Sequence, residues 1–275
     1  MRYFLGFFLI YTLHTSVGQG LTDEMKNQEE QFYASTKQVN QFFRRFNGEE
    51  DEKGNRYSSS DREFRSYSLR KKYLPALFDL ESGQLNQSTA NDFVKQVADK
   101  RSPAFLDFHS NEWLAEVQTV FSSGGREVSG LLYMKLQRQG QGYEWVIDDV
   151  SFDVYKRLFD KDTSERKKFI HPMSHELDFM TFKKAFANDH KEQFTSRKFQ
   201  LDQLSIFLYE LNANKLKFET VKDVKFHFFS IDGWYFSISN FNRPGYNSGW
   251  LIDNVVKIQD ENHKLAMMNY VYDKN

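Results

Sequence analysis

Apolar residues at helical spacing open the first half of the chain. In residues 23–46 they fall three and four positions apart in a strongly polar background, and Asn47–Gly48 follows, which predicts an amphipathic helix that ends there. A capping-box pattern and a run of apolar residues predict a second helix over residues 60–77, disturbed by a proline near its end. A third, short helix is predicted over residues 89–98.

The pattern changes to an alternation of apolar and polar residues after Pro103. This alternation predicts strands over residues 113–121, 128–137 and 144–155. The segments between these strands are rich in glycine, serine and glutamine, as hairpin turns are. The sequence of the first half therefore predicts helices followed by an antiparallel meander.

The second half repeats this order. A charged segment over residues 157–172 is predicted to be a linker, a weakly helical pattern covers 176–187, and residues 199–211 give the clearest helix of the chain. The predicted strands of this half are 216–220, 221–231, 234–241, 249–258 and a final one over 268–272.

One motif closes the meander in both halves. Trp145-Val-Ile-Asp-Asp-Val occurs in the first, and Trp250-Leu-Ile-Asp-Asn-Val occurs 105 residues later in the second. Such internal similarity indicates that the same arrangement of secondary-structure elements occurs twice in the chain. It predicts two tandem α+β domains, over residues 28–156 and 173–275.

The order of elements, the aromatic content and the terminal Trp-Val-Ile strand resemble the nuclear transport factor 2-like superfamily over Gln28 to Ile258. The passage from Phe226-His227-Phe228-Phe229 to Trp250 also looks like exported bacterial proteins with tandem units of this kind. The resemblance implies two tandem cone-shaped domains, each with N-terminal helices packed on a curved antiparallel sheet. It implies no assigned function.

The N-terminus has the pattern of a secretory signal. Met1–Arg2 precedes about eleven largely apolar residues, and Ser16-Val17-Gly18 supplies small residues for a cut after position 18. The sequence therefore predicts a signal peptide over residues 1–18 and an exported protein, periplasmic or extracellular. The chain has no cysteine, which excludes disulfides, thiol nucleophiles, cysteine metal sites and a lipid-anchor site.

Charge and aromatic content narrow the classes of partner. Lys and Arg number 37 against 38 Asp and Glu, so no net field favours nucleic acid or anionic lipid, and no membrane insertion is expected after signal cleavage. Aromatics make up 17% of the residues, with 28 Phe, which suits a packed core and also apolar pockets.

His227 is the main candidate for acid–base chemistry. Strand alternation puts it on the more polar face of its strand, near Tyr235 and Ser237, where it could also be a surface residue. The enzymes of the resembled superfamily hold a His with Asp, or an Asp with Tyr, in a deep pocket. Asp148 and Asp253 recur in the repeated motif, but a fold residue recurs through duplication as well.

Other sequence features give weaker indications of a metal site or a catalytic site. His171 and His175 resemble metal ligands, but Pro172 breaks the helix that would bring them together, and a capped helix entrance is the favoured interpretation. No serine-hydrolase or phosphate-loop pattern occurs in a suitable context. We therefore expect no catalytic residue, metal or cofactor.

The loop over residues 242–249 is longer than a hairpin requires. Its Arg243 could meet a carboxylate or a sugar hydroxyl, and Tyr246 lies beside it. Trp113 is a similar candidate in the other half. The predicted ligand-binding residues are Trp113, His227, Tyr235, Arg243 and Tyr246.

The sequence as a whole favours an exported, non-catalytic protein that binds a small molecule, a glycan or a protein partner. The alternative is an isomerase or dehydratase-type enzyme with His227, Asp148 or Asp253 as its base. A third interpretation is an assembly module that forms a homodimer through the outer faces of its sheets.

Overall fold

The computed structural model describes residues 39–158 except 52 and 84, residues 183 and 187, and residues 202–243 and 247–272. The predicted signal peptide, the His171–His175 cluster and most of the predicted linker lie outside the described residues.

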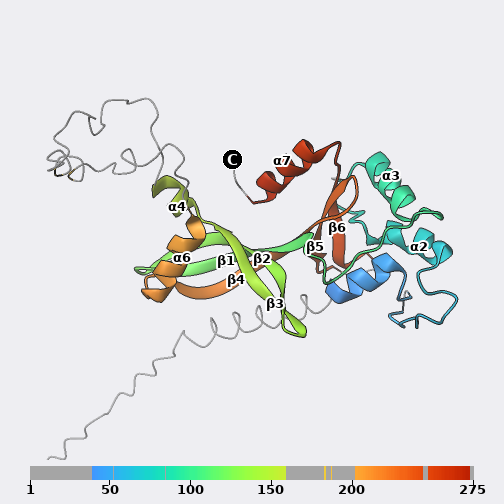
Figure 1. Ribbon diagram of the computed structural model, residues 1–275, viewed down its shortest axis with the longest axis horizontal. Helices are drawn as coiled ribbons and strands as arrows, with labels where there is room; N and C mark the ends of the chain where they lie inside the picture. Colours follow the sequence, from blue (N-terminus) through green and yellow to red (C-terminus); the bar gives the residue numbers. More distant parts are fainter. Residues whose placement is uncertain are drawn as a thin grey trace, which may run out of the picture.

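The described chain is an α+β fold built on one antiparallel sheet of six strands, in the order β3-β2-β1-β4-β5-β6 (Figure 1). The fold class is thereby confirmed at this level. The strands are β1 (Trp113–Ser123), β2 (Arg126–Gln139), β3 (Gly142–Ser151), β4 (Lys217–Ile231), β5 (Trp234–Phe241) and β6 (Gly249–Lys257). The segments 216–220 and 221–231, predicted as two strands, form the single strand β4.

The two predicted meanders are present, but they join through β1 and β4 into one sheet. Each meander has a bulge at the same place: the β2–β3 ladder skips Asp148, and the β5–β6 ladder skips Asp253. Counted from the bulge through the strand pairs, Ala115 in the first meander occupies the position that Phe226 occupies in the second. Because these two residues also pair with each other across β1 and β4, a local twofold axis passes between them and relates the meanders.

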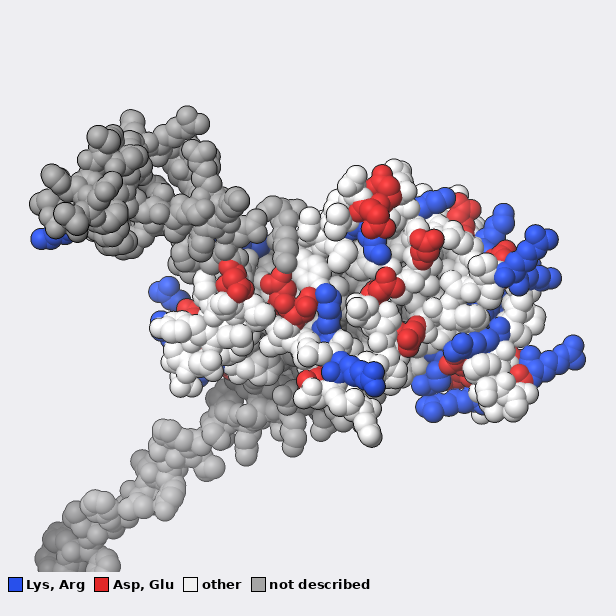
Figure 2. Space-filling model, in the orientation of Figure 1, with Lys and Arg blue, Asp and Glu red and all other residues white. Residues whose placement is uncertain are grey.

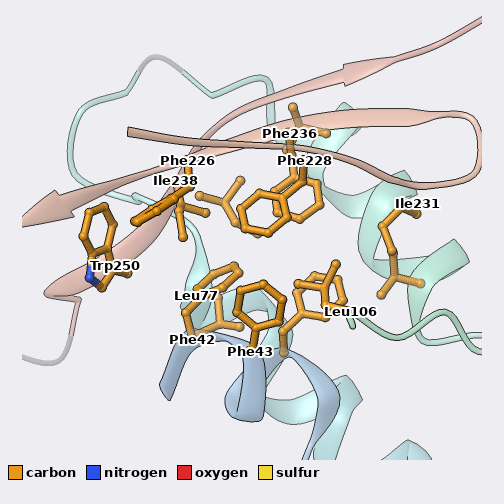
Figure 3. Packing of buried hydrophobic residues seen from close by; sticks show 14 of the residues in the cluster. Phe42, Phe43, Leu77, Leu106, Phe226, Phe228, Ile231, Phe236, Ile238 and Trp250 are labelled. Atoms are coloured by element: carbon orange, nitrogen blue, oxygen red, sulfur yellow. The ribbon is translucent and has the colours of Figure 1, made fainter. Parts of the chain in front are cut away.

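Helices from the first half cover the second meander. They are the helix over residues 39–47, α2 (Tyr67–Tyr73), the 3-10 helix η1 (Leu74–Leu77) and α3 (Gln87–Val97). Figure 3 shows Phe42, Phe43 and Leu77 on these helices facing Phe228 and Phe236 on the sheet. The Phe43 and Phe228 ring centroids are 5.6 Å apart, within the range of favourable aromatic pairs.

A helix from the second half covers the first meander in return. α6 (Gln203–Asn212) packs on β3 at the opposite end of the sheet from α2 and α3, next to α4 (Asp153–Leu158) (Figure 1). Its Phe207 ring lies 5.4 Å from both Phe121 and Phe152. The helices thus cross between halves, and the predicted pair of separate tandem cones is not confirmed.

Several elements differ from the prediction by more than a residue or two at their ends. The second helix begins after Ser66, whose side chain accepts a hydrogen bond from Leu69 N–H, and not at Ser60. The third strand ends at Ser151, and α4 replaces its predicted extension. The predicted strand over 268–272 is wrong: α7 (Glu261–Val271), capped by Asp260, occupies this part of the chain.

α7 packs on the other face of the sheet. Its Val271, together with Tyr272 just after it, joins a second apolar cluster with Leu114, Tyr133 and Tyr235. The sheet therefore carries helices on both faces, and polar side chains on the α7 face are enclosed between layers.

Candidate functional site

A pocket of about 460 Å³ lies between η1, the segment 78–85 and α3. This volume falls in the range of small-molecule sites. Both apolar and polar side chains form its wall. The apolar lining includes Pro75, Phe78, Leu80, Leu85 and Val94, and the polar lining includes Lys72, Asp79, Gln87 and Asn91.

Local sequence signals position the two helical walls. Asn86 caps α3, because its side chain accepts hydrogen bonds from the backbone N–H groups of Ser88 and Thr89 at 3.0 and 3.1 Å. The pocket-facing residues of α3 then follow at helical spacing, at 87, 90, 91 and 94. Phe93 and Val97 point from the same helix into the core, so α3 separates the pocket from the sheet.

Asn247 fastens the third wall to the loop between β5 and β6. Its side-chain nitrogen donates to the carbonyls of Phe78 and Ala76 at 2.6 and 3.3 Å. Its side-chain oxygen accepts from the Leu80 N–H at 3.1 Å. The pocket is therefore held by hydrogen bonds between segments that are far apart in sequence.

Arg243 reinforces this attachment. Its Nη2 donates to Asp79 Oδ1 at 2.7 Å, its Nε donates to the Asn247 carbonyl at 2.6 Å, and it lies 3.3 Å from a Glu81 oxygen. Burial alone would raise the pKa of the Asp79 carboxyl, but hydrogen bonds from Ser82 and Arg243 outweigh burial and hold that pKa below its usual range. Asp79 is therefore ionised, and its hydrogen bonds hold the pocket wall in place.

Exposed Lys and Arg side chains lie near the pocket, together with the exposed acidic residues Glu81, Asp92 and Asp99. Figure 2 shows Lys and Arg side chains gathered at the end formed by α2 and α3. The exposed Lys and Arg side chains at this end of the molecule include Lys71, Lys72, Lys95, Lys100 and Arg101. Lys72, which lines the pocket, brings a positive charge to it.

A second polar group lies on the α7 face of the sheet. His227 is 4% exposed, with Nδ1 at 2.9 Å from the Tyr235 hydroxyl and Nε2 at 3.2 Å from a Glu116 carboxylate oxygen. Strand alternation correctly put His227 with Tyr235 and Ser237, but His227 is not a surface residue. Burial raises the pKa of the Tyr235 phenol, so this hydroxyl stays protonated at neutral pH.

The repeated aspartates occupy the two bulges and both bind lysine. Asp253 accepts hydrogen bonds from Ser237 and Ser239 at 2.5 and 2.7 Å and pairs with Lys225 at 2.9 Å. Asp148 pairs with Lys135 at 2.9 Å and accepts from the Tyr272 hydroxyl at 2.8 Å. Both carboxylates therefore have contacts that hold the strands together, as the fold interpretation of the repeat expects.

The predicted ligand-binding residues do not form one site. His227 and Tyr235 are bonded to each other on the α7 face, and Arg243 stands behind the pocket wall. Trp113 lies in the core on the opposite face, where its ring stacks on Phe228 at 5.6 Å and its Nε1 donates to the Phe108 carbonyl at 3.0 Å. Tyr246 lies outside the described residues.

Sequence reasoning missed the pocket and the buried Arg70 of α2. The Arg70 guanidinium donates to the carbonyls of Phe46, Val97 and Ala104 and so ties together the ends of three segments. Burial lowers its pKa to about 10. An arginine between Leu69 and Lys71 on a polar helix gives no sequence signal of burial.

Within the part of the chain that the structure describes, no group of His, Asp or Glu side chains could hold a metal ion. None of the described helices is long and apolar enough to cross a membrane. No family model, curated protein or solved structure matches this chain.

Proposed function

We propose that this chain is an exported binding protein that holds a small amphipathic molecule in the pocket between η1 and α3 and carries out no reaction on it. The observation that carries the proposal is the 460 Å³ pocket itself, whose wall combines apolar side chains with charged and amide groups. Lys72 in the pocket lining favours a ligand that bears a negative group.

The chemistry of the pocket supports binding more than catalysis. A general base works best with a pKa near the operating pH. The pKa of the Asp79 carboxyl is instead held low by the contacts that fasten the wall. The pocket thus offers shape, apolar surface and charge to a ligand.

Titration with 1-anilinonaphthalene-8-sulfonate, a fluorescent aromatic anion, tests the proposal. We expect saturable binding that Ala76→Trp weakens at least about tenfold, because a large ring at this exposed lining position fills the pocket. Ser88→Trp is the matched control, since position 88 lies on α3 but is not among the pocket-lining residues. Equal dye binding by both variants would place the dye elsewhere and remove the support for the pocket.

The alternative, an isomerase or dehydratase-type enzyme, has one observation in its favour. His227 lies between a protonated Tyr235 hydroxyl and Glu116, an arrangement able to move a proton. The lining of the η1–α3 pocket, however, includes none of these three residues. We therefore rank this alternative second.

We also propose the kinship with nuclear transport factor 2-like proteins and export through the N-terminal signal. The shared bulge, the repeated Trp-x-Ile-Asp motif and the helices packed on an antiparallel sheet support a duplicated unit of that kind. Sequencing the N-terminus of the protein recovered from the periplasm or medium tests export; a mature chain that begins near residue 19 is expected.

A further inference from the structure

Three rings gather at the surface of the β2–β3 hairpin. Tyr143 is 45% exposed and Trp145 is 36% exposed. The exposed His109 ring lies 4.3 Å from the Tyr143 ring, tilted by 30°. Trp145 rests edge-on against the buried Trp113 at 5.3 Å, which fixes the orientation of its ring.

Tyr143 and Trp145 face the same way because they are two residues apart on a strand, and this spacing separates them by about 7 Å. With His109 they form an exposed group of rings, whose polar atoms include the Tyr143 hydroxyl and the His109 ring nitrogens. We call Tyr143, Trp145 and His109 the hairpin platform.

Charge is divided between the two faces of this hairpin. Arg138 pairs with Tyr143 in the β2–β3 ladder, so its exposed side chain starts from the platform face. Glu144 lies between the two rings in sequence and therefore points to the opposite face. Asp148 also belongs to that opposite face, where it binds Tyr272 beside α7. The acidic side chains of β3 thus turn away from the rings, and a cation stands next to them.

We propose that the hairpin platform binds an acidic glycan. Tyr143 and Trp145 stack on the C–H faces of sugar rings, the polar atoms of the platform form hydrogen bonds with sugar hydroxyls, and Arg138 pairs with a sugar carboxylate. Stacked rings supply large contact area at low entropic cost, and a guanidinium matches a carboxylate with two parallel hydrogen bonds. The site is separate from the η1–α3 pocket and does not depend on it.

The first test is calorimetric titration of the mature chain with trigalacturonic acid, followed in parallel by tryptophan fluorescence. We expect binding that changes the tryptophan emission, because Trp145 is the exposed tryptophan among the described residues. Trp145→Ala and Tyr143→Ala should each weaken binding about tenfold or more. Tyr270→Ala, which removes a 68% exposed ring on α7, is the matched control and should leave binding unchanged.

The second test concerns charge. Arg138→Gln should bind trigalacturonic acid about tenfold more weakly and should bind the neutral trisaccharide of galactose as the unsubstituted chain does. Because Arg138 is exposed on a hairpin, this variant keeps the test valid even if Trp145→Ala fails to fold.

Three outcomes would overturn the proposal. They are absence of binding at millimolar trigalacturonic acid, binding that Trp145→Ala, Tyr143→Ala and Arg138→Gln leave unchanged, and equal binding of a hexaglutamate peptide. The last outcome would mean that the surface recognises negative charge on a peptide and has no preference for sugar. Ala76→Trp, which fills the pocket, should not alter glycan binding.

Discussion

Trp145 and Trp250 stand at the same place in the two meanders, on β3 and β6, yet the first is 36% exposed and the second is 6% exposed. Trp250 packs on Phe226 at 4.8 Å inside the cluster that the first-half helices cover. The repeated motif therefore specifies a strand and its bulge in both halves. Whether the tryptophan of the motif lies in the core or at the surface depends on the helices that pack on the meander from the other half of the chain.

Removing the two tryptophans is the most direct test of this difference. Trp250→Ala should lower the free energy of unfolding by about 3–5 kcal/mol, because it leaves a cavity in the core. Trp145→Ala should cost less, about 1–3 kcal/mol, since it removes the ring contacts with Trp113 and Phe226 from a side chain that is 36% exposed. Urea unfolding at neutral pH measures both; equal losses would contradict the assignment of core and surface roles.

The anchors that hold the two sets of covering helices should differ in strength. Arg70→Met should cost about 3 kcal/mol, because three backbone carbonyls around the guanidinium lose their charged donor. At the other end, the Tyr155 hydroxyl donates to Glu210 at 2.7 Å and fastens α6 to α4. Tyr155→Phe should cost about 1 kcal/mol, as a single hydrogen bond does.

Arg70→Lys is the control for charge in this comparison. Lysine keeps the positive charge but lacks the rigid fork that spans several carbonyls. Its loss of stability, followed by thermal unfolding, should be close to that of Arg70→Met. Full stability of Arg70→Lys would mean that charge alone, without the fork, secures these helices.

Close packing in the first meander depends on one glycine. A Cβ added at Gly130 would lie 2.2 Å from the Phe152 ring, whereas the corresponding position of the second meander is Trp234. Gly130→Ala should therefore cost about 1–3 kcal/mol by overpacking. Gly142→Ala, where the nearest atom would be 3.9 Å away, is the control in the same hairpin and should change stability by less than about 0.5 kcal/mol. Equal effects of the two substitutions would rule out Phe152 as the cause.

Local patterns were enough to predict many of the elements. The strand over 234–241 was predicted with the bounds that β5 has, and the helix over 89–98 differs from α3 by a residue or two. Alternation also predicted the neighbours of His227. These features depend on residues close in sequence, where period and capping signals act.

The rest depends on contacts between distant residues. The pairing of Ala115 with Phe226, which merges the meanders, has no local signal, so the sequence suggested two separate domains. The burial of Arg70 depends on carbonyls from three other segments, and the pocket depends on Asn247 reaching residues 76–80. The C-terminal helix was missed because its short apolar run, Met268 to Tyr272, suits a strand equally well.

The repeated aspartates give the smallest and most specific contrast between the halves. Burial works against ionisation of Asp253, but hydrogen bonds from Ser237 and Ser239 and the Lys225 pair outweigh it, so its pKa lies below the ordinary 3.8. A lowered pKa means that the carboxylate contributes stability that is fully present above about pH 4 and is lost as the pH falls through the folded-state value.

Asp253→Asn should therefore cost about 1–2 kcal/mol at neutral pH, and the difference from the unsubstituted chain should shrink below about pH 4. Asp148→Asn should cost less, because the Asp148 side chain is 37% exposed against 16% for Asp253, and water screens its pair with lysine. Urea unfolding at several pH values compares the two variants. If Asp253→Asn lost the same free energy of unfolding at every pH, the shape of the Asp253 side chain, and not its charge, would stabilise the bulge.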